Sequence, residues 1–131
     1  MTAGWNPAVV NQILDSVFSA AAFTPPAASY IQLHTGDPGA AGTAHISSYA
    51  TRTVLAWASA AGGSKSLSAS VTITASWSGT NNEIITHVSY WSAVTGGTFI
   101  VSDQLTAGVP VTTGQPVVLP NATAPWSPLA A

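Results

Sequence analysis

Three histidines and four carboxylates are the residues of this sequence that could bind a metal or transfer protons. His34 and Asp37 stand three residues apart in the segment "YIQLHTGDPGAAGT", and His45 and His87 follow later in the chain. A divalent metal needs three or four such ligands that converge, and their spacing here matches no zinc motif. We interpret His34 and His87 as polar residues on strand faces and His45 as a loop residue. We therefore expect neither a metal nor another cofactor.

Catalytic patterns are equally weak. Serines are frequent, but none lies in the Gly-x-Ser-x-Gly elbow of a serine hydrolase. Glu83 and Asp103 could act as the carboxylate pair of a glycosidase only if the fold brought them together. The letters "HTGDPG" match neither phosphate-binding nor dinucleotide-binding loops. We expect a protein without enzymatic activity.

The same segment fits a chain reversal. Asp37, Pro38 and Gly39 form a strong turn sequence, because Pro sets φ at the second position and Gly tolerates conformations that other residues avoid. We predict a turn in an exposed loop that follows a strand at 30–34.

Charge is the most informative feature of the composition. Charged residues make up 5% of the chain and hydrophobic residues 47%, whereas roughly a quarter of the residues in a typical soluble domain are charged. Charged residues are depleted at the centres of protein interfaces, so this chain is expected to pack against neighbouring proteins. With Arg52 and Lys65 as its only cations, it cannot supply the phosphate contacts of a nucleic-acid-binding protein.

Other compositional signals concern location. No apolar run approaches the roughly 18 residues of a membrane span, so we expect no membrane association. No secretory signal precedes the first amphipathic segment, which favours release into the cytoplasm of the cell that makes the protein. The chain has no cysteine, so no disulfide framework or thiolate metal site is expected.

Periodicity predicts one helix and several strands. Asn6 can cap a helix whose first residue is Pro7, apolar residues recur at helical spacing through residue 21, and "TPP" at 24–26 ends it. After Pro26 the apolar residues alternate with polar ones, which is typical of half-buried strands. The strands are expected at 30–34, 49–57, 66–77, 84–91, 98–105 and 115–119, with a glycine hairpin between the fourth and fifth.

These elements indicate a mainly β fold: an antiparallel β-sandwich or small barrel, with one N-terminal α-helix against a face or an edge. We place a single helix-plus-sandwich domain at 1–119. Residues 120–131 are rich in Pro and small residues and should form an extended C-terminal arm.

The five tryptophans admit two interpretations. Trp57, Trp77 and Trp91 fall on strands and should fill the core, while Trp5 and Trp126 should anchor the termini on a neighbour. Alternatively, exposed tryptophans could stack on sugar rings beside the 34–48 loop.

The order of motifs resembles a family of small virion proteins of tailed bacteriophages, especially those of actinobacteria. The resemblance covers roughly residues 8–119 and rests on the "LHTGDPG" segment, "YATRTVLAW" and the closing hairpin "THVSYWSAVTGGTFI". The matching residues are Leu33, His34, Thr35, Asp37, Pro38, Gly39, Tyr49 and Arg52. Members are labelled tail fibre, minor tail or head-associated proteins, so the resemblance implies a virion structural protein and brings no catalytic role.

From these observations we expect a capsid decoration or minor capsid subunit that stabilises the particle. The alternative is a tail or tail-fibre component that binds a host-surface glycan. Its partners would be the major capsid protein or tail proteins, and self-association would give a homo-oligomer, as a trimer on a local threefold axis. We expect the protein in the virion, assembled in the host cytoplasm.

The residues of the resemblance are expected to build a structural loop that serves as an interface. Arg52 should hold the 35–48 loop, through Asp37 or through backbone carbonyls, because its planar fork can bond several oxygens at once. The expected site consists of His34, Asp37, Pro38, Gly39, Tyr49 and Arg52.

Overall fold

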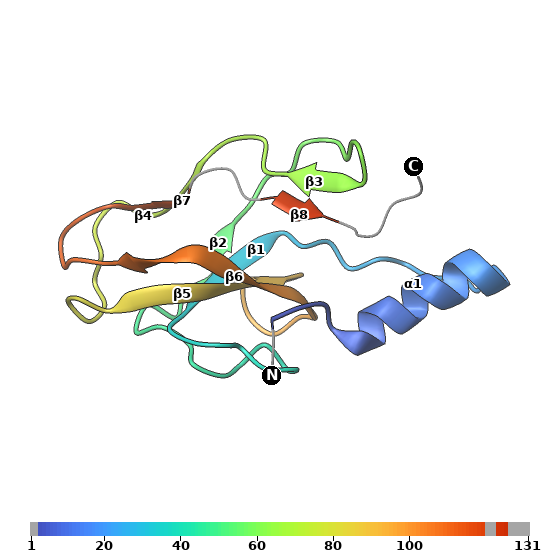
Figure 1. Ribbon diagram of the computed structural model, residues 1–131, viewed down its shortest axis with the longest axis horizontal. Helices are drawn as coiled ribbons and strands as arrows, with labels where there is room; N and C mark the ends of the chain where they lie inside the picture. Colours follow the sequence, from blue (N-terminus) through green and yellow to red (C-terminus); the bar gives the residue numbers. More distant parts are fainter. Residues whose placement is uncertain (1–2, 120–122, 126–131) are drawn as a thin grey trace.

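A computed structural model of the chain describes residues 3–119 and 123–125. In this part of the chain one helix, α1 (Pro7–Ser19), precedes eight strands (Figure 1). The strands are β1 (Tyr30–His34), β2 (Thr53–Val54), β3 (Ser64–Ser66), β4 (Val71–Thr74), β5 (Ile84–Trp91), β6 (Phe99–Pro110), β7 (Val117–Leu119) and β8 (Thr123–Pro125).

The main sheet has the strand order β2-β1-β5-β6, and its neighbouring strands are antiparallel. β5 and β6 form the predicted hairpin, and the turn between them contains Gly96 and Gly97 at φ values of 62° and 72°. Only glycine takes such positive φ values at little cost, so the paired glycines determine where the chain reverses.

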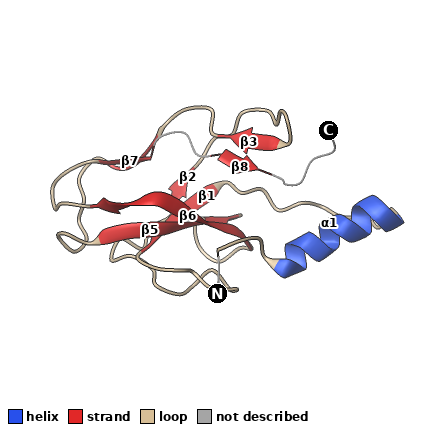
Figure 2. Ribbon diagram, viewed as in Figure 1, coloured by secondary structure: helices blue, strands red, loops and turns tan. Residues whose placement is uncertain are grey.

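A second layer covers one face of the main sheet. It consists of two short antiparallel pairs, β3 with β8 and β4 with β7, which lie on the same side of the main sheet (Figures 1 and 2). The core lies between the layers and contains Ile31, Leu33, Leu55, Leu67, Ile73, Trp77, Ile85, Val88, Tyr90, Val111, Val117 and Leu119. The predicted mainly β, antiparallel, sandwich-like fold with an N-terminal helix is confirmed.

Helix α1 forms where the sequence predicts it. The Asn6 side chain accepts a hydrogen bond from the backbone N–H of Ala8 at 3.0 Å, and Pro7 occupies the first helical position. The helix ends at Ala20, which has a φ of 53°. Within the described residues, no helix is long and apolar enough to cross a membrane.

The predicted packing of α1 against the sandwich is wrong. The helix projects away from the sheets (Figure 1), and Val9 is its only buried residue. Leu14, Val17 and Phe18 are exposed by 41%, 71% and 81%. The helix therefore leaves an apolar surface in contact with solvent.

Three of the predicted strands are shorter than expected. Of 49–57, only β2 is a strand, although Trp57 makes an isolated bridge to Leu67. Of the alternating run at 66–77, β4 covers 71–74 and β3, which begins at Ser64, includes only Ser66, because β3 pairs with β8 whereas β4 pairs with β7. Of 115–119, only 117–119 is a strand. β6, in contrast, continues to Pro110.

The proposed C-terminal arm contains β8. Its residues pair with β3 in the register Ser64↔Pro125, Lys65↔Ala124 and Ser66↔Thr123. The other residues of 120–131 lie outside the described chain, and the division into a domain and an arm stays a prediction.

Candidate interaction site

The 35–48 loop folds back onto the end of β1. The Thr35 N–H donates to the carbonyl of His45 at 2.8 Å, and the Ser47 N–H donates to the carbonyl of Leu33 at 3.0 Å. The loop packs toward the face of the main sheet that points away from the core. We call this the second face; the buried residues Gln32, His34, Ser89 and Trp91 define it.

The predicted turn at Asp37 is present. Its Oδ1 accepts a hydrogen bond from the Gly39 N–H at 2.9 Å, and Gly39 has a φ of 73°. His45 Nδ1 lies 2.9 Å from the Asp37 carbonyl oxygen, which can only accept, so this nitrogen carries the proton. Pro38 is fully buried. The loop is therefore a packed element and is less exposed than predicted.

The second carboxylate oxygen of Asp37, Oδ2, is buried and has no hydrogen-bond partner among the described residues. A buried acceptor without a partner lowers stability, so this carboxylate does not brace the loop through both of its oxygens.

His34 is a fully buried polar residue of the site, with an exposure of 0%. Its Nδ1 lies 2.7 Å from the Ala44 carbonyl oxygen and therefore donates. Its Nε2 is then the acceptor for the hydroxyl of Ser89 at 2.7 Å. Ser89 Oγ in turn accepts from the indole N–H of Trp91 at 2.8 Å. The hydrogen bonds run in one direction from Trp91 to the 35–48 loop.

Burial favours the neutral form of the imidazole. It is the main cause that lowers the pKa of His34 below its ordinary value; the hydrogen bond to the Ala44 carbonyl opposes this shift, and nearby His87, His45 and Arg52 add to it. The pair of Ser89 and His34 contains two members of a serine-hydrolase triad, but the third position holds a peptide carbonyl instead of a carboxylate. Ser89 is also fully buried, so its hydroxyl is not accessible to a substrate.

Arg52 does not hold the 35–48 loop, and that prediction is wrong. Its Nη1 donates to the carbonyls of Ala93 and Gly96 at 2.9 and 2.7 Å, both in the turn between β5 and β6. Its Nε lies 3.3 Å from Gln32 Oε1. The fork does bind backbone carbonyls, as expected, but of a different loop.

Glu83 is the charged residue that holds the 35–48 loop. Its carboxylate accepts from the backbone N–H of Ser48 at 3.1 and 3.2 Å and from the Ser48 hydroxyl at 2.6 Å. Ser48 Oγ also accepts from the Thr80 N–H at 2.7 Å. The loop is thereby tied to the turn before β5.

The fold does not bring Glu83 and Asp103 together as a glycosidase pair would require. Asp103 is the register partner of Val88, five residues along β5 from Glu83. At about 3.3 Å per residue this separates the two positions by roughly 16 Å, whereas glycosidase carboxyl groups lie about 5 to 9.5 Å apart.

The histidines are used as polar residues. Both ring nitrogens of His34 have partners in the protein, and His87 Nδ1 lies 2.8 Å from Thr86 Oγ1. Within residues 3–119 and 123–125, no group of three or more potential ligands could hold a metal ion.

The tryptophans divide between core and surface. Trp77 and Trp91 are buried, as predicted, and the Trp77 ring lies 5.4 Å from the ring of Tyr49. Trp5 is 37% exposed but bridges to Val101 of its own β6. Trp126 lies outside the described residues, so its role as an anchor stays a prediction.

Trp5 lies beside the 35–48 loop. Together with Gly39, Ala40 and Phe99 it lines a shallow pocket of about 300 Å³. The glycan interpretation expected at least two tryptophans there. Of the tryptophans that the structure describes, only Trp5 lines this pocket.

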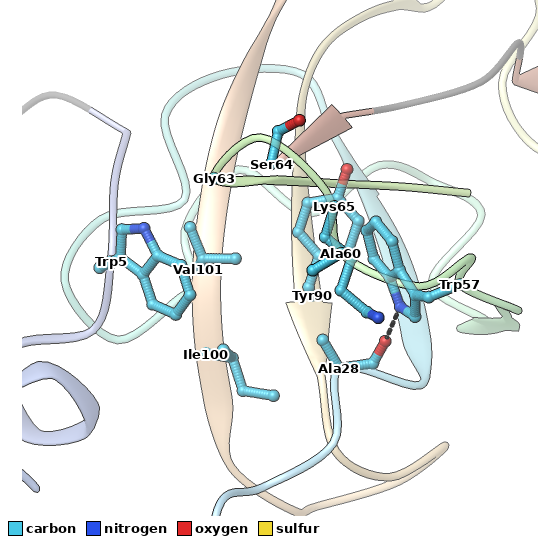
Figure 3. A pocket seen from close by; sticks show the side chains of 10 residues that line it. All are labelled: Trp5, Ala28, Trp57, Ala60, Gly63, Ser64, Lys65, Tyr90, Ile100 and Val101. Atoms are coloured by element: carbon cyan, nitrogen blue, oxygen red, sulfur yellow. Dashed lines mark hydrogen bonds between the residues drawn. The ribbon is translucent and has the colours of Figure 1, made fainter. Parts of the chain in front are cut away.

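An apolar pocket, which the sequence patterns did not predict, lies elsewhere in the structure. Its volume is about 380 Å³, and it lies between the core-side face of β5 and β6 and the chain around β3. Trp5 forms one side, and Trp57 and Tyr90 form the other (Figure 3). The Trp57 N–H donates to the Ala28 carbonyl at 2.6 Å, which fixes the indole at the pocket wall.

Comparison with known proteins finds one family model that matches most of the chain. The model of the family described as "Podophage GP4 fiber I protein gp80" matches residues 5–124, which include α1, the 35–48 loop and all eight strands except the last residue of β8. No curated protein matches the chain. Because the match covers most of the 131 residues, the chain belongs to this family of bacteriophage fibre proteins.

Proposed function

We propose that this protein is a non-enzymatic structural subunit of a phage fibre, and that it packs against copies of itself through α1. The observation that carries the proposal is the exposed apolar face of this helix. Leu14, Val17 and Phe18 are all exposed on a helix that projects away from the sandwich.

A helix of this kind needs a partner. Helices shorter than about 12 to 15 residues are marginal in water, and most of their stability in proteins comes from packing an apolar face. α1 has 13 residues and only one that is buried. Contact with another protein surface would supply the missing packing.

The sequence of the helix favours a copy of the same chain. Val10, Ile13 and Val17 follow the spacing of three and four residues at which helices interlock, and β-branched residues at these positions favour assemblies of more than two helices. Asp15 is the only charged residue of the helix. Identical helices would therefore meet without extensive repulsion, and we propose a trimer.

Two locations on the particle are compatible with such a trimer. The family description supports the fibre; the capsid surface, as a decoration subunit, is the second location. Gold-labelled subunits imaged on intact particles would distinguish them. Label at the tail fibres is the expected result. Label spread over the capsid would favour decoration, and absence of label from the particle would contradict a virion role.

A further inference from the structure

The apolar pocket beside β3 has no side chain of the described residues filling it. Its walls are formed by the aromatic rings of Trp5, Trp57 and Tyr90 and by Ile100 and Val101, and Lys65 and Ser64 from β3 lie at its rim (Figure 3). A sugar would need several polar groups to bond its hydroxyls, and this lining offers few of them. The pocket fits an apolar side chain.

The register of β3 and β8 indicates where such a side chain comes from. Pro125, the last described residue, pairs with Ser64, which lines the pocket. The next residue of the chain is Trp126, followed by Ser127 and the apolar Leu129. The chain beyond β8 therefore begins beside the pocket.

The register gives the position along β3. Gly63, Ser64 and Lys65 all line the pocket, and Ser64 and Lys65 are the register partners of Pro125 and Ala124. If the antiparallel ladder continued by one residue, position 126 would lie opposite Gly63.

We propose that the indole of Trp126 from the same chain occupies this pocket and latches the β3–β8 pair onto the core-side face of β5 and β6. Tryptophan buries more apolar surface than the other residues of the segment can, and aromatic walls suit it through edge and offset contacts. The latch would tie the C-terminal end of the chain to Trp5 at its N-terminal end. The inference does not depend on the oligomeric state.

The test is a double-substitution cycle measured by thermal melting of the full-length chain. Trp126→Ala should lower the melting temperature by at least about 4 °C, whereas Ser127→Ala, at the neighbouring position, should leave it nearly unchanged. Combining Trp126→Ala with Val101→Ala should lower it by less than the sum of the single changes, because each removes part of the same contact. Val118→Ala, at an exposed position of β7, should combine additively.

Additive behaviour of Trp126→Ala with Val101→Ala, or an unchanged melting temperature of Trp126→Ala, would overturn the proposal. A second measurement on the unsubstituted chain covers the case in which a variant does not fold. Nuclear Overhauser contacts between the Trp126 ring and the Val101 methyl groups are expected within one chain. Their absence, or their appearance only between differently labelled chains, would overturn the assignment to the same chain.

Discussion

The guanidinium carbon of Arg52 lies 3.7 Å from the centroid of the Trp91 ring. Arg52 therefore binds the β5–β6 turn in two ways, through the carbonyls of Ala93 and Gly96 and through the ring at the end of β5. Trp91 in turn donates to Ser89, which donates to His34. A single network on the second face thus connects the turn between β5 and β6 with the 35–48 loop.

Removal of the arginine should weaken the turn. We expect Arg52→Ala to lower the free energy of unfolding by about 1 to 3 kcal/mol, because two charge-assisted hydrogen bonds and a cation–π contact are lost. Arg52→Lys should recover part of this loss, since an ammonium keeps the charge but not the planar fork. Chemical denaturation of the three proteins measures the difference.

Hydrogen exchange distinguishes this role of Arg52 from one at the 35–48 loop. In Arg52→Ala, faster exchange is expected for amides in residues 92–98, while the Thr35 and Ser47 amides should stay protected. If protection were lost first in residues 35–48, the assignment of Arg52 to the turn would be incorrect.

The His34 network predicts a dependence of stability on pH. Burial lowers the pKa of His34 in the folded protein below the ordinary value of about 6.5 that it has when unfolded. The unfolded chain therefore takes up a proton first as the pH falls, and this shifts the equilibrium toward unfolding. The stabilising contribution should be complete above about pH 6.5 and should be lost as the pH falls through the lowered pKa. In His34→Gln this part of the pH dependence should disappear from denaturation curves, and its persistence would contradict the network.

Ser89→Ala tests the same network at constant pH. The substitution leaves Nε2 of His34 and the indole N–H of Trp91 buried without their partner. A cost of about 1 to 3 kcal/mol is expected at pH 7.5, as for other buried groups that lose a hydrogen bond. Ser92→Ala, in the more exposed turn, serves as the comparison and should cost less.

Gly42 should not tolerate a side chain. Its φ is +70°, and an added Cβ would collide with the ring of Phe99. Gly42→Ala should cost about 2 to 4 kcal/mol, the sum of backbone strain and displacement of the ring. Gly62→Ala is the matched control, because Gly62 has a φ of +56° but open space around it. Equal losses of stability in the two variants would show that the loop does not pack on Phe99 as described.

Local sequence patterns were sufficient to predict those elements that contain their own capping, turn or alternation motif. Asn6 and Pro7 begin α1, alternation of apolar and polar residues marks β1, and the paired glycines reverse the chain between β5 and β6. The alternating run at 66–77, however, does not show that β3 and β4 have different partners, because pairing depends on residues far away in the chain.

The candidate site was harder to predict for the same reason. The pairing of β1 with β5 in one register brings His34 close to Ser89 and Trp91. The spacing of 55 residues between His34 and Ser89 does not reveal this strand pairing. Arg52 was expected at the loop next to it in sequence, yet Gln32 and the distant turn lie closer. The alternation of Ser89 and Trp91 on one strand face was the only available hint.

If α1 is an interface between copies of the chain, sedimentation equilibrium should detect the assembly and its loss when the helix is altered. We predict a trimer for the unsubstituted protein, dissociation to monomers in Phe18→Glu, where a charge would be buried among apolar side chains, and a trimer in Gln12→Glu, on the opposite face of the helix. A monomer at all concentrations in the unsubstituted protein, or trimers that persist in Phe18→Glu, would show that α1 is not an interface between copies of the chain.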